Sequence, residues 1–280
     1  MPKPKYILTY IGVFFLLVAT GPASAFGADG HRNVAGIAEN HISENTAQAL
    51  DAILGESDLG SLSLWPDQIR GKAKWKHTRY WHYINVADGA QLETATRSSK
   101  GDVLSALEQS FRQLQLPSGE ISDREHLEAL AFFVHFAADI HQPLHVGRRS
   151  DRGGNLVGIK WSGKTRLTNL HWVWDSGLLK TAGLSVEDYV KQLDRAGKKQ
   201  IRHWQQDSFL DWARESKMLR SQVYEFGIGV NPSAAGKKSR IITEDYINRN
   251  RPIIEKRLLM AGIRLAGHLN RLYDPASNNN

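Results

Sequence analysis

Beyond residue 26, apolar residues recur every three or four positions along most of the chain, which is the period of an amphipathic helix. The pattern predicts helices over residues 34–42, 103–114, 123–140, 168–179, 186–193, 198–218 and 244–272. Asp123 and Thr168 can cap the third and fourth of these helices. Residues 156–161 are the only clear strand candidate, and the Ser-Gly turn after them indicates one small hairpin. With no internal repeat and no long linker, we expect an all-α, single-domain protein.

The first 25 residues follow a different pattern. Lys3 and Lys5 precede an apolar run over residues 6–19, and small residues at positions 23 and 25 match a cleavage site. This order predicts a signal peptide over residues 1–25 that is removed before Phe26. A transmembrane anchor is the alternative, but a run of 14 residues is shorter than the ~20 that a spanning helix needs.

We therefore expect an exported protein, periplasmic or secreted, with a folded domain over residues 26–274 and a disordered tail over 275–280. No second apolar stretch is long enough to span a bilayer. The mature chain is accordingly expected to have no stable membrane association, and we also expect a monomer.

Composition narrows the possible chemistry. The chain has no cysteine, which excludes disulfides and thiolate metal sites, so any metal must be held by His, Asp, Glu or backbone groups. The net charge is +7, of which +5 remains once Lys3 and Lys5 leave with the signal peptide. That excess suits an anionic substrate such as a phosphate ester or a nucleic acid. It also suits many other proteins, so the charge alone does not decide the function.

The 11 histidines and 16 aspartates supply candidate metal ligands. A His and an Asp four positions apart share one helix face, and random placement gives about 0.6 such pairs. Three pairs occur: His135/Asp139, His171/Asp175 and His203/Asp207. The first two lie among apolar and aromatic residues, where a buried polar group needs a metal or a salt bridge as its partner. The third lies in a strongly polar helix and is interpreted as a solvated face.

Other histidines are less informative on their own. Pro143 can end a helix and turn the chain, so that His145 returns towards His135 and Asp139. His31, Asp67 and His82 carry little signal in isolation. The remaining histidines are interpreted as structural or exposed: His41, His77, His126, His141 and His268.

Six ordered motifs combine these residues: FGADGH at 26–31, WPDQIR at 65–70, WHYIN at 81–85, EHLEALAFFVHFAADIHQPLH at 125–145, RGGN at 152–155 and TNLHWVWD at 168–175. In their order and spacing the sequence resembles the type I nuclease family over essentially the whole mature chain. That family comprises zinc-dependent single-strand nucleases and 3'-nucleotidases, which are distant relatives of the zinc phospholipases C. The resemblance implies the helical fold of that superfamily.

The resemblance also implies three bound Zn²⁺ ions and identifies the residues of this sequence that would be their ligands. Phe26, through its α-amino and carbonyl groups, and His31 would hold one ion. Asp67, His82 and His135 would hold a second, and Asp139 would bridge the two. His145, His171 and Asp175 would hold the third, more exposed ion.

The implied activity is hydrolysis of single-stranded DNA and RNA to 5'-phosphate products, together with hydrolysis of 3'-nucleotides. Asp67 would orient the nucleophile, and Arg70 would stabilise charge on the phosphate. Tyr83 would stack on a base, and Asn155, beside Gly154, would contact the substrate. Each role has an alternative: Tyr83 as a core aromatic, Arg70 as a surface salt-bridge residue, and the glycines as a simple turn.

The sequence departs from the family pattern at two positions. Phe26 replaces the usual Trp, and Asn85 replaces the Asp of the better-known fungal members, which leaves base preference open. The absence of cysteine and of a usable N-x-S/T site favours a bacterial-type member. Two other functions are alternatives: a zinc phospholipase C, whose ligand series ends in His-x-x-x-Glu, and a non-catalytic zinc-binding protein. Asp175 argues against the first, and Arg70 argues against the second.

Overall fold

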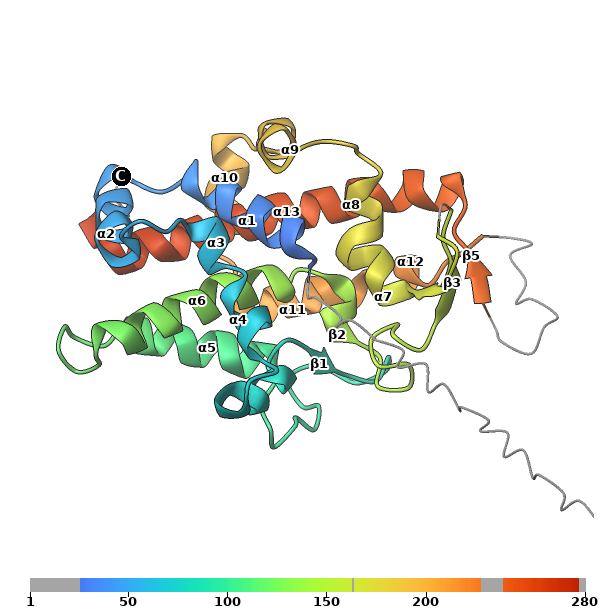
Figure 1. Ribbon diagram of the computed structural model, residues 1–280, viewed down its shortest axis with the longest axis horizontal. Helices are drawn as coiled ribbons and strands as arrows, with labels where there is room; N and C mark the ends of the chain where they lie inside the picture. Colours follow the sequence, from blue (N-terminus) through green and yellow to red (C-terminus); the bar gives the residue numbers. More distant parts are fainter. Residues whose placement is uncertain (1–25, 163, 228–238, 277–280) are drawn as a thin grey trace, which may run out of the picture.

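The structure is a computed structural model that describes residues 26–162, 164–227 and 239–276, so the predicted signal peptide and most of the predicted tail lie outside the described residues. Helices dominate the described chain, as predicted (Figure 1). The α-helices are α1 Ala28–Glu39, α2 Glu44–Leu54, α3 Leu59–Leu62, α4 Trp65–Ile69, α5 Val103–Leu114, α6 Asp123–Asp139, α7 Leu170–Trp172, α8 Leu178–Lys180, α9 Val186–Leu193, α10 Lys198–Trp204, α11 Phe209–Met218, α12 Arg220–Val223 and α13 Glu244–Tyr273. The described chain also has two 3₁₀ segments and one π-helical turn: Ala73–Tyr80, Pro143–His145 and Val173–Gly177.

Capping side chains explain two differences from the predicted helices. Ser122, not Asp123, caps α6, because the Ser122 hydroxyl accepts from the Glu125 amide while the Glu125 carboxylate accepts from the Ser122 amide. The predicted helix over 198–218 is broken into α10 and α11, and the Ser208 hydroxyl caps the second of them. The first helix ends at Glu39, before the last apolar position assigned to it.

The segment predicted as one helix over 168–179 is more elaborate. Thr168 does not cap it but lies in strand β4, Thr168–Asn169. The side chain of Asn169 caps α7 instead, accepting from the Trp172 amide at 2.7 Å. A π-helical turn separates α7 from α8. Such turns occur frequently at functional sites.

The predicted hairpin is present and is part of a larger arrangement. Strand β3, Gly158–Lys160, pairs antiparallel with β4, and β5, Ser239–Ile241, adds a parallel third strand. The Ser-Gly turn involves residue 163, which lies outside the described residues. A second sheet pairs β1, Ile84–Asn85, with β2, Val146–Gly147, in parallel. This second pairing fixes two distant stretches of chain side by side.

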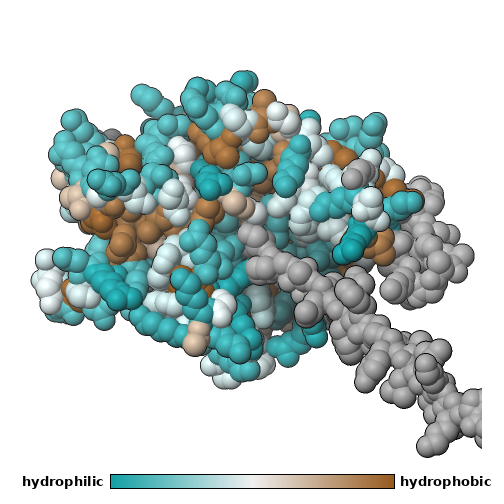
Figure 2. Space-filling view, in the orientation of Figure 1, coloured by the Kyte–Doolittle hydropathy of each residue, from teal (hydrophilic) through white to brown (hydrophobic). Residues whose placement is uncertain are grey.

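The helices form a bundle around one apolar core. Helix α5 packs along α6, and α1 packs along the long α13, with the short strands gathered towards one end (Figure 1). The second half of α6 is buried all round, from Ala129 to Asp139. The face drawn in Figure 2 is mostly hydrophilic, with hydrophobic side chains in limited patches. None of the helices in the described part of the chain combines the length and apolar character that a membrane crossing requires.

Candidate metal centre

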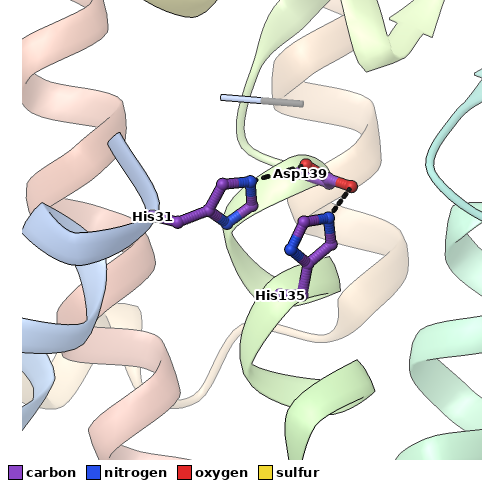
Figure 3. Close-up of side chains that lie close together, drawn as sticks. All are labelled: His31, His135 and Asp139. Atoms are coloured by element: carbon purple, nitrogen blue, oxygen red, sulfur yellow. Dashed lines mark ion pairs between the residues drawn. The ribbon is translucent and has the colours of Figure 1, made fainter. Parts of the chain in front are cut away.

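The end of α6 carries the centre of the site. His135 and Asp139 are one helical turn apart and both are fully buried, with His135 Nε2 3.2 Å from Asp139 Oδ2. Helix α1 brings His31 from the other side, with its Nε2 3.4 Å from Asp139 Oδ1 (Figure 3). The His31 and His135 rings stack with centroids 3.9 Å apart. These three side chains form the first group that can hold a metal ion.

A second group shares His135 and adds residues from two other segments. Asp67 comes from the first turn of α4, and His82 follows the 3₁₀ segment that leads into β1. The Asp67 Oδ1 lies 3.7 Å from His82 Nδ1 and 3.9 Å from His135 Nε2. His82 Nδ1 also lies 3.1 Å from Asp139 Oδ2, so the first two groups are contiguous through Asp139.

The third group contains His145, His171 and Asp175. His145 Nε2 lies 3.5 Å from Asp175 Oδ1, and His171 Nε2 lies 3.3 Å from Asp175 Oδ2. The pairing of β1 with β2 sets His145 beside His82, while the π-helical turn holds Asp175. All eight side chains that the resemblance assigned as zinc ligands therefore lie in the three groups.

Backbone carbonyls fix the orientation of three of the imidazoles. His135 Nδ1 lies 2.7 Å from the Ser63 carbonyl oxygen, His145 Nδ1 lies 2.6 Å from that of His82, and His171 Nδ1 lies 2.7 Å from that of Gly153. A carbonyl oxygen only accepts, so each Nδ1 must carry a proton, and in the neutral ring each Nε2 then presents a lone pair. This arrangement, in which the far ring nitrogen is held by the protein, is typical of metal-binding histidines.

Buried polar atoms in the site lack hydrogen-bond partners among the described residues. They are both ring nitrogens of His31, His82 Nε2, Asp139 Oδ1 and His145 Nε2. Burying polar atoms without partners costs free energy, so their concentration around Asp139 requires an explanation. Imidazole nitrogens and carboxylate oxygens in groups of three, with no thiolate, fit divalent metal ions and suit zinc well.

Burial and charge set the protonation of the imidazoles. Burial lowers the pKa of His31, and it lowers the pKa of His82 to about 4. Burial opposes protonation of His145 too, but the carboxylates of Asp139 and Asp175 outweigh it and raise its pKa to about 9. Neutral imidazole is the form that binds metal. The site therefore favours neutral ligands at His31 and His82 and attracts a cation beside His145.

A cleft of about 450 Å³ opens beside the third group. It is lined by Arg70, Arg79, His82, Tyr83, Asn85, Leu144, His145, Arg152, Asn155 and His171. Three of the predicted substrate residues thus face one space: Arg70, Tyr83 and Asn155. Tyr83 is 36% exposed, so it is not a core aromatic. Arg70 Nη1 lies 3.1 Å from Asp67 Oδ1, which joins the cleft to the metal centre.

The glycines of the RGGN motif shape the turn behind the cleft. Gly153 and Gly154 have φ values of 61° and 79°, which L side chains rarely adopt. A Cβ at Gly153 would lie 2.4 Å from the carbonyl oxygen of Leu144. Gly154 is in this turn, close to Leu144 and His171, and is not among the residues that line the cleft, so its contact with substrate stays a prediction.

The structure adds site residues that the sequence reasoning missed. Gln142 is fully buried, and its side-chain amide donates to Asp175 Oδ1 at 2.5 Å while its carbonyl oxygen accepts from the Leu144 amide. Arg79 and Arg152 line the cleft. Gln142 lies three residues before His145 in the motif over 125–145, but a glutamine there gives no signal of its own.

Phe26 is fully buried with its ring 6.5 Å from that of His31.

Comparison with known proteins agrees with this site. Residues 26–274 match the S1/P1 Nuclease family. The chain is 31% identical to Endonuclease 1 of Arabidopsis thaliana, over 95% of this chain and 93% of that protein. It is 28% identical to Nuclease S1 of Aspergillus oryzae, over 87% and 90%, and 31% identical to Nuclease P1 of Penicillium citrinum, over 54% and 57%. The resemblance to the nucleases is confirmed, and the chain belongs to the S1/P1 nuclease family.

Proposed function

We propose that this protein is a zinc-dependent endonuclease that hydrolyses single-stranded DNA and RNA to 5'-phosphate products and also hydrolyses 3'-nucleotides. The observation that carries the proposal is the convergence of three His/Asp groups beside a cleft that also holds Arg70 and Tyr83. The names of the relatives, endonucleases and nucleases, support a nucleic acid as the substrate. We propose no phospholipase or purely zinc-binding role, because no observation favours either.

The residues that would hold three zinc ions are Phe26, His31, Asp67, His82, His135, Asp139, His145, His171 and Asp175. Bound zinc supplies Lewis-acid chemistry: it polarises a phosphate oxygen and makes water a stronger nucleophile. The three aspartates would offset about half of the summed charge of three divalent ions. The site would then keep a net positive charge that attracts a phosphodiester.

Arg70 and Asp67 act at the boundary between the metal centre and the cleft. Their ion pair, 3.1 Å between Arg70 Nη1 and Asp67 Oδ1, holds the guanidinium at the cleft lining. From there Arg70 can donate hydrogen bonds to phosphate oxygens as negative charge builds up in the transition state. Asp67 orients the attacking water. Arg79 and Arg152 add positive charge along the same cleft.

Tyr83 and Asn155 supply the contacts to the base and the strand. A half-exposed ring at the cleft can stack on any base, which suits unpaired strands and gives little sequence preference. The Asn155 amide is held at the cleft by donating to the Arg152 carbonyl at 2.9 Å. A duplex keeps its bases stacked inside, so this mode of binding favours single strands.

We further propose that the protein acts as a monomer outside the cytoplasm and that cleavage before Phe26 creates a ligand. The freed α-amino group of Phe26 would join His31 at the first zinc. Adding one alanine before Phe26 should then remove that zinc and cut turnover by roughly a hundredfold or more. Zinc content and turnover of the extended and native proteins check this. Full activity with the extra residue would contradict the role of the Phe26 amine.

The main experiment measures metal content and turnover together on exported, processed protein. Single-stranded DNA, RNA, a 3'-nucleotide and phosphatidylcholine are tested before chelation, after chelation and after zinc is restored. We expect about three zinc ions per chain, and hydrolysis of the nucleic acids and the 3'-nucleotide that is lost on chelation and recovered with zinc. Hydrolysis that survives chelation, or bound zinc with no nucleic acid hydrolysis, would contradict the proposal.

A further inference from the structure

A second pocket of about 300 Å³ lies beside the cleft and shares Tyr83 and Asn85 with it. Its other lining residues are Tyr80, Ile84, Thr96, Arg97, Ser98, Ser99, Lys100, Gly101, Asp102 and Arg149. None of these ten residues belongs to the three metal-binding groups. The pocket therefore continues the cleft beyond Tyr83, away from the metal centre.

Two cations at this pocket have no carboxylate partner among the described residues. Arg149 is exposed, and its guanidinium takes part in none of the hydrogen bonds or ion pairs of the described residues. The Lys100 ammonium lies 4.7 Å from the centre of the Tyr80 ring and 3.4 Å from its hydroxyl, with no acid in contact. Arg97, by contrast, is neutralised by Asp102, with Arg97 Nε 2.8 Å from Asp102 Oδ2. Lys100 and Arg149 are thus available to an anion.

The loop that carries Lys100 is held in place rather than loose. The Trp81 indole donates to the Lys100 carbonyl at 3.2 Å. Gly101 follows with a φ of 84°, and a Cβ there would lie 2.8 Å from Trp81 Nε1. The Lys100 amide also donates to the Ser98 hydroxyl. A prearranged cation loses less freedom on binding, which favours a binding role.

We propose that this second pocket is a subsite for a further nucleotide unit of the same single strand, with Lys100 and Arg149 contacting its phosphates. The inference rests on the proposed nuclease function. The pocket is continuous with the cleft, and it combines the exposed ring of Tyr83 with the cations of Lys100 and Arg149. This combination suits the alternating bases and phosphates of a strand better than it suits an acidic peptide. The consequence is that the enzyme would select substrates by their length. A mononucleotide would occupy only the cleft, whereas a longer strand would occupy the second pocket as well.

The test compares substrates of different length on the zinc-loaded enzyme. The variant Lys100→Ala/Arg149→Ala removes the two cations, and Lys198→Ala/Lys199→Ala removes two exposed cations on α10 as a matched control. A charge-conserving variant, Lys100→Arg/Arg149→Lys, tests for rescue. The kcat/KM is measured for a 3'-nucleotide, a dinucleotide and a strand of about ten nucleotides, each over a range of salt concentrations.

We expect the wild type to prefer the long strand and the double-alanine variant to lose about tenfold of that preference. The slope of log kcat/KM for the strand against log salt should fall by about 1.4, because two phosphate contacts are lost. The control should keep the preference, and the charge-conserving variant should restore most of it.

Three results would overturn the inference while leaving the proposed function intact: an unchanged preference in the double-alanine variant, an equal loss in the control, or a wild type with no preference for length. A wild type that hydrolyses none of the substrates would refute the proposed function and this inference with it.

Discussion

Two clusters of buried and partly buried ionisable side chains adjoin the end of α6, and they satisfy their polar atoms in different ways. One is the paired cluster, which consists of His141, Asp207, Glu215, Arg257 and Arg264. Arg264 reaches both oxygens of Glu215, at 2.7 and 2.8 Å, and also contacts Asp207 and His141. Arg257 contacts Glu215 and donates to the His141 carbonyl at 3.0 Å. Nearly every charge here meets an opposite charge or an acceptor.

The metal centre contains His–Asp contacts too, but several of its buried atoms make no hydrogen bond. Both ring nitrogens of His31 and one oxygen of Asp139 have no hydrogen-bond partner in the described structure. Elsewhere in the described structure such atoms are scattered over single residues, Arg264 Nε among them, whereas here atoms from several residues gather around Asp139. The contrast shows that a buried polar cluster is a candidate functional site when its side chains leave one another's hydrogen-bonding atoms without partners.

The largest expected effect comes from removing the Asp139 carboxylate, which lies at the middle of the metal centre. Asp139→Asn takes away a charge that faces His31, His82 and His135, so zinc should be lost and turnover should fall at least about a thousandfold. Zinc should also raise the melting temperature of the wild type, because it binds only the folded state, but not that of the variant. Zinc content, turnover and thermal unfolding check this.

Asp123→Asn is the matched control, since it lies exposed in the first turn of the same helix. It should keep full zinc content and turnover. If Asp139→Asn bound as much zinc as this control, the unpaired atoms around Asp139 would need another explanation.

A smaller effect, on stability alone, is expected from breaking the paired cluster. Glu215→Ala leaves two buried arginines short of a counter-charge and should lower the free energy of unfolding by about 3 kcal/mol. Urea unfolding measures this, and the folded variant should still bind zinc. Glu187→Ala, which removes an exposed partner of Lys191, should leave the unfolding midpoint unchanged. Equal midpoints for the two variants would show that the paired cluster contributes nothing.

Sequence periodicity predicted most of the long amphipathic helices, missed the 11-residue α2, and failed for the shortest elements. The helices over 103–114 and 186–193 have the predicted bounds. The pattern gave no helix for α2, α3 or α4, of which the last two have four and five residues. The parallel pair β1–β2 was also missed, because two-residue strands carry no alternation and their pairing joins Ile84 to Val146 across the fold.

The candidate site shows the same division between local and distant signals. The four-residue spacing marked His135 with Asp139, because neighbours on one helix face can be seen in a sequence. Asp67 and His82 gave no local signal, since only tertiary packing brings them to His135, and they were assigned through the family resemblance. His203 is exposed as interpreted, but Asp207 does not lie on a solvated face: it pairs with Arg264, which no local pattern indicates.

The smallest expected effect concerns a buried imidazole that is neither paired nor part of a metal group. His268 is 8% exposed, and both its ring nitrogens lack hydrogen-bond partners among the described residues. Aromatic rings surround it, with those of Phe111 and Phe209 centred 4.8 and 4.7 Å away. Burial lowers its pKa to about 3. This residue tests whether an unsatisfied buried group must imply a ligand.

Below its ordinary pKa of about 6.5, His268 takes up a proton in the unfolded chain but not in the folded one. Its contribution to stability is therefore complete above that pH and is lost as the pH falls towards the folded value. Between pH ~6.5 and ~4.5 the loss is about 2 kcal/mol. His268→Leu should remove this loss, so the gap in urea midpoint between variant and wild type should widen on acidification, with chelator present in both. A gap that stays constant with pH would mean that His268 is protonated in the fold and has a partner of its own.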